Sequence, residues 1–367
     1  MSVAIPRPRP GIMEIRPYVG GKAEVAGATD IVKLSSNESA IGPSPAAMAA
    51  FRAEAGRLHR YPDGGCTALR QKIGQRFNLD ADRIVCGAGS DELISLLIRA
   101  FAGPGDEVLY SAHGFLMYKL SALAAGATPV AAPEIDLRAD VDAMLERVTT
   151  RTRIVFIANP NNPTGSHLSA AELARLHAGL PPDVLLVIDA AYAEFVSAPD
   201  YSDGQELALA HPNVVMARTF SKLFGLAALR LGWMLGGEAV VDVINRIRGP
   251  FNVGQPAQAA GIAALDDLEH QERARAHNDR WLPWLIDEIG RLGFKVWPSV
   301  GNFVLVDFGD AAARKAATAQ LEGDGVIPRD MTAYGLASCL RITVGLEEEN
   351  RRMVASLAGL AGRRRAA

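Results

Sequence analysis

Apolar runs of strand length alternate with helix-like segments along most of the chain. The strand-like runs are residues 83–86, 107–110, 152–158, 184–189, 214–217 and 231–235. Helical patterns precede or separate them, at residues 45–59, 67–77, 91–101, 115–125, 141–148 and 170–178. Residues 184–189 are apolar up to a final aspartate, which is typical of a strand buried on both faces of a sheet. The alternation predicts an α/β fold with a mostly parallel sheet covered by helices.

The pattern changes after Asn252. A long helical stretch, residues 256–292, is followed by strand-like runs at residues 294–297, 303–308 and 340–344. We therefore expect three parts, in keeping with the length of 367 residues. They are an N-terminal arm (residues 1–44), a large domain (45–251) and a smaller α+β domain (252–367).

Composition excludes several classes of function. A net charge of −3 gives no reason to expect a nucleic-acid partner, and Gly, Pro or charged residues interrupt every apolar segment that could span a membrane. The seven histidines form no HExxH pattern, so we expect no catalytic metal. Three widely spaced cysteines without a CxxC pair, and a start without the apolar stretch of a secretory signal, predict a cytoplasmic protein.

Lys222 lies in the segment Ala217 to Leu226, which is mostly small, hydroxyl-bearing or apolar apart from Arg218, and Arg230 follows eight positions after the lysine. Most lysines near strand ends are solvated charges. A lysine between a buried strand and a small-residue turn, with hydroxyls beside it and an arginine after it, also suits a Schiff base with a phosphorylated aldehyde. That cofactor is pyridoxal 5′-phosphate.

A carboxylate ends another predicted strand. Asp189 closes the run 184–189, and the carboxyl edge of a parallel sheet is where open α/β folds bind ligands. Asp189 alone is better explained as a helix cap than as a catalytic residue. Together with Lys222 it indicates a partner for a protonated pyridine ring, and Tyr192 can hydrogen-bond the phenolic oxygen of that ring.

A third strand-end turn follows residues 152–158. Two prolines and a glycine in the sequence Asn159 to Gly165 restrict its backbone, so the Asn162 amide can point at a bound ring.

Further ordered motifs accompany these turns: residues 16–18 (RPY), 33–38 (KLSSNE), 42–45 (GPSP), 61–65 (YPDGG), 87–92 (GAGSDE) and 339–345 (CLRITVG). With them, the chain resembles the fold type I pyridoxal phosphate aminotransferases, and more closely the histidinol-phosphate aminotransferase family. The resemblance implies that the arm joins the small domain and that the large domain binds the cofactor. It also implies a homodimer with shared active sites.

The resemblance extends to the cofactor phosphate and ring. Gly89 and Ser90 precede an apolar helix, where amide groups favour an anion. From the residues alone an ordinary capping box is the better explanation, and the resemblance shifts the interpretation to a phosphate site. By the resemblance, the phosphate site also includes Thr219, Ser221, Arg230 and, from the neighbouring subunit, Tyr61. By the resemblance, Phe115 corresponds to the aromatic residue that stacks on the pyridine ring of the cofactor. The alternative is that Phe115 is an ordinary phenylalanine of the hydrophobic core.

Substrate recognition is expected from two arginines. Arg341 lies on an apolar strand, where a guanidinium needs an anionic partner. Arg329 matches the other anion-binding arginine of the family, and could instead pair with Asp330 at the surface. Tyr18 resembles a phosphate contact from the arm, and Asn37 is placed in the same pocket.

The resemblance implies transfer of the amino group of L-histidinol phosphate to 2-oxoglutarate in histidine biosynthesis. Lys222, Asp189 and Tyr192 are the expected catalytic residues. The alternatives are an aminotransferase for phenylalanine and tyrosine, a phosphothreonine decarboxylase of the same fold, and a cofactor-binding regulator. The absence of a helix-turn-helix extension argues against the regulator.

Overall fold

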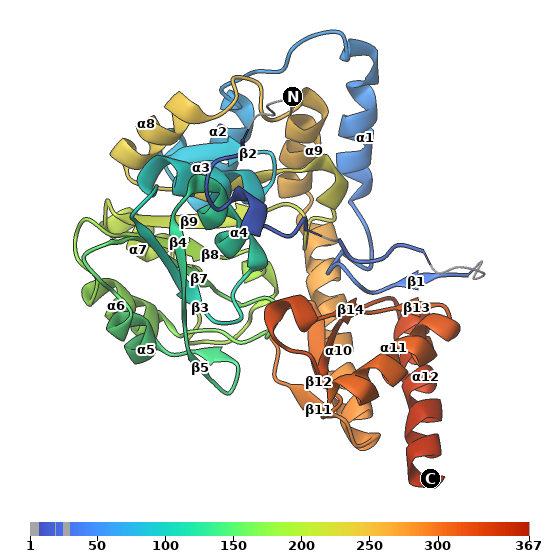
Figure 1. Cartoon of the computed structure of the whole chain (residues 1–367). Coiled ribbons are helices and arrows are strands. Elements are labelled where there is room, and N and C mark those ends of the chain that lie inside the picture. The colour runs from blue at the N-terminus through green and yellow to red at the C-terminus, as the bar shows by residue number, and fades with distance from the viewer. Residues whose placement is uncertain (1–6, 19, 25–29, 367) are drawn as a thin grey trace, which may run out of the picture.

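The computed structural model describes residues 7–18, 20–24 and 30–366, so parts of the predicted N-terminal arm lie outside the described residues. Two sheets organise these residues (Figure 1). The larger sheet has seven strands and the smaller has four, and helix α10 (Leu268–Arg291) runs alongside the smaller one. A boundary at residue 252 remains a prediction.

The seven-stranded sheet is parallel except for β10, which runs antiparallel to both of its neighbours. In spatial order its strands are β2 (Ile84–Gly87), β10 (Gly232–Leu235), β9 (Val214–Thr219), β8 (Leu185–Asp189), β7 (Thr152–Ala158), β3 (Glu107–Ser111) and β4 (Thr128–Ala132). The predicted α/β class with a mostly parallel sheet is confirmed.

Helices cover both faces of this sheet (Figure 1). They are α2 (Thr67–Phe77), α3 (Ser90–Phe101), α4 (Leu116–Ala125), α5 (Val141–Glu146), α6 (Ala170–Ala178), α7 (Gln205–Ala210), α8 (Glu238–Ile247) and α9 (Gln255–Asp266). Helix α1 (Pro45–Ala53) packs against α9. Side chains of one strand alternate between two cores: Leu186 and Ile188 belong to one, and Leu185 and Val187 to the other. The apolar run of β8 therefore reflects burial on both faces.

The second sheet is antiparallel, in the order β11 (Lys295–Trp297), β12 (Phe303–Asp307), β15 (Cys339–Thr343) and β14 (Arg329–Asp330). It packs with α10 (Leu268–Arg291), α11 (Ala311–Gly323) and α12 (Glu347–Ala366) around a third core. From the N-terminal segment, β1 (Val32–Lys33) pairs in parallel with β13 (Val326–Ile327). The described part of the arm thus contacts the small domain, as Figure 1 also shows.

Several sequence-based boundaries were wrong. The expected helix 45–59 ends at Ala53, three residues before Gly56, which disfavours helix. The stretch 256–292 is two helices, because Asp267 leaves the helical conformation and its side chain caps α10 by accepting a hydrogen bond from the His270 amide. Strand β4 was missed, since Pro129 and its alanines are poor strand formers that an edge position tolerates.

Candidate active site

Three neighbouring parallel strands, β7, β8 and β9, end at the same edge of the large sheet. The residues that follow them line a cavity of about 240 Å³. The small domain and the N-terminal segment close it from the other side, through residues such as Arg341 and Ser36. Of the residues expected from sequence, those lining the cavity are Tyr18, Ser90, Phe115, Asn162, Asp189, Tyr192, Thr219, Ser221, Lys222, Arg230, Arg329 and Arg341.

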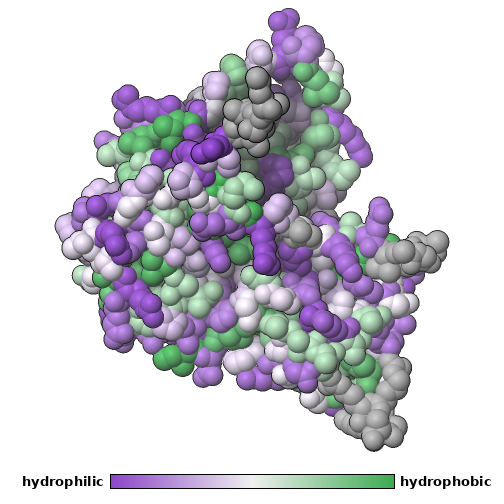
Figure 2. Space-filling model, in the orientation of Figure 1, coloured by the Kyte–Doolittle hydropathy of each residue, from purple (hydrophilic) through white to green (hydrophobic). Residues whose placement is uncertain are grey.

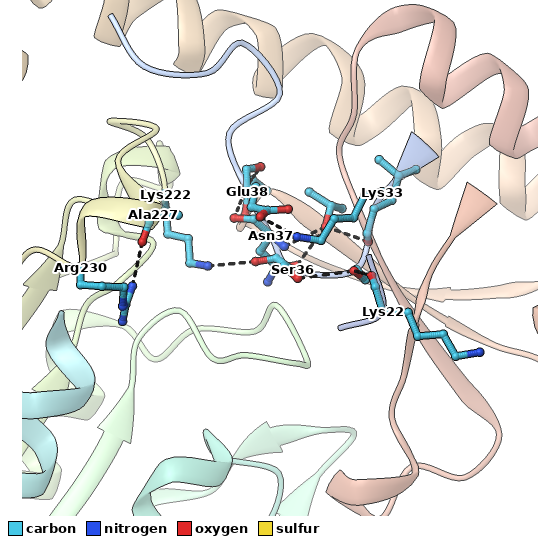
Figure 3. Close-up of polar contacts among 12 residues, drawn as sticks. Lys22, Lys33, Ser36, Asn37, Glu38, Lys222, Ala227 and Arg230 are labelled. Carbon is cyan, nitrogen blue, oxygen red and sulfur yellow. Dashed lines mark hydrogen bonds and ion pairs between the residues drawn. The ribbon is translucent and has the colours of Figure 1, made fainter. Parts of the chain in front are cut away.

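Lys222 follows β9 and points across the cavity to the N-terminal segment, where its Nζ donates a hydrogen bond of 3.2 Å to the carbonyl oxygen of Ser36 (Figure 3). Its ammonium lies 5.5 Å from the centre of the Tyr192 ring. Burial, and next the positive charge of Arg341, lower the pKa of Lys222 to about 8. A substantial fraction of the amine is therefore neutral near physiological pH, as a nucleophile or base requires.

Asp189 ends β8 and is buried. Its Oδ2 accepts a hydrogen bond of 2.8 Å from the Tyr118 hydroxyl, whereas its Oδ1 is buried and has no partner among the described residues. Burial raises the pKa of Asp189 to about 6, against the lowering effect of the Tyr118 hydrogen bond. An unpaired carboxylate oxygen that lines a cavity suits a cationic N–H donor, such as a protonated pyridine ring.

Small and hydroxyl-bearing residues meet at the start of α3. Gly89 has a positive φ of 81°, and a Cβ added there would lie 2.5 Å from Arg230 Nη2, so only glycine lets the guanidinium approach. Arg230 Nη1 donates to Ser221 Oγ at 3.4 Å and to Ala227 O at 3.0 Å, the latter drawn in Figure 3. The Thr219 hydroxyl contacts Ser221 Oγ at 3.0 Å. Hydroxyls, a helix start and a guanidinium together suit a phosphate.

The Arg341 guanidinium is buried in β15. It donates hydrogen bonds to the Asn162 side-chain oxygen and, at 2.9 Å, to the Ser35 carbonyl oxygen. Its Nε has no hydrogen-bond partner, and no carboxylate forms an ion pair with it among the described residues. Burial lowers the pKa of Arg341.

Arg329 lies opposite Arg341 across β14 and β15, with its guanidinium carbon 5.6 Å from the centre of the Tyr18 ring. Asp330, the acid next to Arg329 in the chain, forms an ion pair with the buried Arg314. Two arginines and a tyrosine hydroxyl therefore border one end of the cavity.

Three expected residues do not line the cavity. Gly89 lies next to the Arg230 guanidinium. The Asn37 side-chain amide donates a hydrogen bond of 2.9 Å to the hydroxyl of Tyr192, which does line the cavity. Tyr61 is 83% exposed and stacks on Phe251, with 4.6 Å between ring centres. Within one chain, Tyr61 is separate from the site.

Sequence reasoning missed other lining residues: Ser35, Ser36, Glu38, Asp91 and Tyr334. Asp91 forms an ion pair of 2.8 Å with Arg230. Ser35, Ser36 and Glu38 belong to the motif at residues 33–38. Because they are neighbours of Asn37 in the chain, the sequence offered a signal for them. No motif around Tyr334 indicated that this residue would line the cavity.

The described residues contain no group of three or more His, Cys, Asp or Glu side chains that could hold a metal ion. Over the same part of the chain, we find no helix with the length and apolar character needed to cross a membrane.

Comparison with known proteins gives consistent matches. The family described as aminotransferase class I and II matches residues 29–357. The histidinol-phosphate aminotransferase of Paramagnetospirillum magneticum is 60% identical, covering 97% of this chain and 99% of that protein. That of Rhodospirillum rubrum is 53% identical over 96% of each. The structure of histidinol-phosphate aminotransferase from Sinorhizobium meliloti in complex with pyridoxal-5′-phosphate superposes with a TM-score of 0.90 at 29% identity, covering 100% of both chains.

Proposed function

The chain belongs to the aminotransferase class I and II family, and on that premise we propose that it is a histidinol-phosphate aminotransferase. In this reaction the amino group of L-histidinol phosphate passes to 2-oxoglutarate, giving imidazole acetol phosphate and glutamate. The observation that carries the proposal is the buried Arg341 guanidinium, which faces the cavity of Lys222 without a carboxylate partner among the described residues. A buried cation of this kind needs an anion, and both substrates supply one.

Pyridoxal 5′-phosphate fits the residues present. The unpartnered Oδ1 of Asp189 suits its ring nitrogen, and the Lys222 amine suits its aldehyde. Ser90, Thr219, Ser221 and Arg230 suit its phosphate, while Phe115, Asn162 and Tyr192 suit the ring face and phenolic oxygen. When bound, the cofactor supplies an electron sink for the electron pair released at the substrate α-carbon.

The residues of the chain then perform three tasks. Lys222 Nζ, neutral in part because of its lowered pKa, removes the proton from the substrate α-carbon. Asp189 Oδ1 holds the ring nitrogen, and Tyr192, itself held by Asn37, orients the ring oxygen. Asp189, Tyr192 and Asn37 are buried, which limits the access of water to the proton that Lys222 moves.

Arg341, Arg329 and Tyr18 are the proposed anion site. They bind the phosphate of histidinol phosphate in one half-reaction and a carboxylate of 2-oxoglutarate in the other. A guanidinium suits both, because its planar fork of donors matches either anion.

A homodimer with shared active sites is the second part of the proposal. Large apolar side chains are exposed on and near α1, namely Met48, Phe51, Leu58, Tyr61 and, from the segment after α8, Phe251. Figure 2 shows hydrophobic residues beside hydrophilic ones over this part of the molecule. An apolar hollow lined by Met48, Phe51 and Leu226 continues the surface. Such a surface suits a second copy of the chain, which would carry Tyr61 to the neighbouring phosphate site.

A cytoplasmic location is also proposed. The three cysteines are free and buried, which suits a reducing compartment.

One substrate panel tests the function. We expect purified protein with pyridoxal phosphate to turn over histidinol phosphate with a kcat/KM at least ~100-fold above that for phenylalanine or tyrosine. Preference for the aromatic amino acids, or carbon dioxide release from phosphothreonine without a keto acid, would contradict the proposal.

A labelling experiment tests the assigned lysine. Borohydride reduction followed by peptide mapping should place the cofactor on Lys222, and Lys222→Ala should lose turnover. Lys315→Ala, a change at an exposed lysine on α11, is the matched control and should retain it.

A further inference from the structure

Tyr118 lies in the first turn of α4, is fully buried and is not among the residues that line the cavity of Lys222. Its hydroxyl donates the 2.8 Å hydrogen bond to Asp189 Oδ2 across 71 positions of sequence. Its ring stacks on Phe156 of β7, with 4.6 Å between centres and 14° between planes. Packing therefore fixes where the hydroxyl can be.

The main chain of Asp189 is equally fixed, because it lies between β7 and β9 and pairs with Ala158 and Ala217. The position of the Asp189 carboxylate therefore depends only on the torsion angles of its side chain. A carboxylate is planar, so a hydrogen bond that holds Oδ2 also directs Oδ1. Oδ1 is the oxygen left buried and unpartnered in a residue that lines the cavity.

The same turn of α4 carries Phe115. The Tyr118 amide donates to the Phe115 carbonyl oxygen at 3.0 Å, and the two rings meet edge to face at 5.9 Å and 90°. Phe115 lines the cavity, whereas Tyr118 stands behind it. The first turn of α4 thus connects Phe115, assigned to the face of the cofactor ring, with Asp189, assigned to the nitrogen of that ring.

We propose that Tyr118 is a positioning residue that acts through Asp189, holding Oδ2 so that Oδ1 meets the ring nitrogen of the cofactor. This inference rests on the proposed function, since it presumes that pyridoxal phosphate binds here. By donating a hydrogen bond, the Tyr118 hydroxyl also lowers the proton affinity of the Asp189 carboxylate. The proton shared with the ring therefore stays on the ring nitrogen, where it makes the ring a better electron sink.

The test is Tyr118→Phe, which removes the hydroxyl and keeps the ring. Tyr110→Phe is the matched control, because Tyr110 is a nearby buried tyrosine, 6.2 Å from Tyr118 between ring centres, that lines no part of the cavity. Two readouts are independent of turnover. They are the dissociation constant of pyridoxal phosphate and the ¹⁵N chemical shift of the bound, ring-labelled cofactor.

We expect Tyr118→Phe to weaken cofactor binding at least ~10-fold, since a hydrogen bond to a charged group is lost. The ¹⁵N resonance should move toward that of the unprotonated ring, and Tyr110→Phe should change neither readout. In an Asp189→Asn background, Tyr118→Phe should add less than ~2-fold, because its effect passes through the carboxylate.

Unchanged affinity and an unchanged resonance in Tyr118→Phe would overturn the inference, as would a full additional loss in the Asp189→Asn background. Failure of the unaltered protein to bind pyridoxal phosphate would instead contradict the proposed function. If Tyr118→Phe does not fold, a fluorinated tyrosine at position 118 keeps the ring and strengthens the donor. It should move the ¹⁵N resonance the opposite way, and no movement would overturn the inference.

Discussion

Arg341 on β15 donates a hydrogen bond to the side-chain oxygen of Asn162, in the turn that follows β7. The central strand of the small domain thereby contacts one of the turns assigned to the cofactor ring. A second contact lies close by, where the Val300 amide donates to the Gly165 carbonyl oxygen at 3.0 Å. A hydrogen bond thus links Arg341, proposed to bind the substrate anion, to Asn162, proposed to contact the cofactor ring.

Arg341→Met should therefore separate activity from stability. We expect kcat/KM for histidinol phosphate to fall at least ~100-fold, because a charged hydrogen-bond donor to the substrate anion is lost. The cofactor-free protein should be equally stable or up to roughly 2 kcal/mol more stable, since a buried, unpaired charge is removed. Steady-state kinetics and urea unfolding measure the two effects. Arg291→Met, at an exposed position, should leave both unchanged, and a strongly destabilised Arg341→Met would contradict the prediction.

Asp189→Asn should change how stability depends on pH in the cofactor-free protein. The pKa of Asp189 is raised by burial from 3.8 to about 6, so the folded state holds this proton more tightly than the unfolded state. Stability from this group is therefore present below pH ~4 and is lost as pH rises to ~6. At pH 7 we expect Asp189→Asn to be about 1–3 kcal/mol more stable than the unaltered protein, with little difference near pH 4.

Urea unfolding at both pH values measures this difference. Asp242→Asn, in an exposed pair with Arg246, serves as the control and should show no such dependence. A stability difference of the same size at pH 4 and pH 7 would show that ionisation of Asp189 is not its cause.

Arg218 forms a buried ion-pair group with Glu194 at 3.0 Å and Asp203 at 3.2 Å. Replacing it by methionine leaves the Glu194 carboxylate buried without its partner, and we expect a loss of about 3–5 kcal/mol in the free energy of unfolding. Arg246→Met removes an exposed pair and should cost less than about 1 kcal/mol. Equal effects of the two substitutions would be inconsistent with this assignment.

Tyr61 offers a test of shared active sites, because it lies outside the cavity of its own chain. Tyr61→Ala should weaken cofactor binding by about 10-fold, through loss of a phosphate contact from the second copy. At a pyridoxal phosphate concentration too low to load Tyr61→Ala sites, mixing Tyr61→Ala with Lys222→Ala chains should restore activity to about one quarter of the normal value, because half of the dimers are hybrids and each hybrid contains one intact site. Leu209→Ala, at a partly exposed apolar residue on α7, is the control. No recovery on mixing, with dimers present in sedimentation experiments, would refute the shared site.

Sequence alone determined most of the alternation of strands and helices in the large domain, but not β4, α7 or α8, and it determined the turns that end β7, β8 and β9. These features depend on neighbouring residues: apolar runs specify buried strands, and prolines and glycines specify turns. Asn162, Asp189 and Lys222 follow successive strands of this kind, so their convergence at one sheet edge followed from the parallel topology.

Only the tertiary structure decided which groups meet across long distances in the chain. The Tyr118 hydroxyl on Asp189, the Ser36 carbonyl on Lys222 and the Asn162 amide on Arg341 join segments 71, 186 and 179 positions apart. No local pattern encodes such pairs, because each depends on how whole elements pack and on which polar atoms that packing leaves to be satisfied.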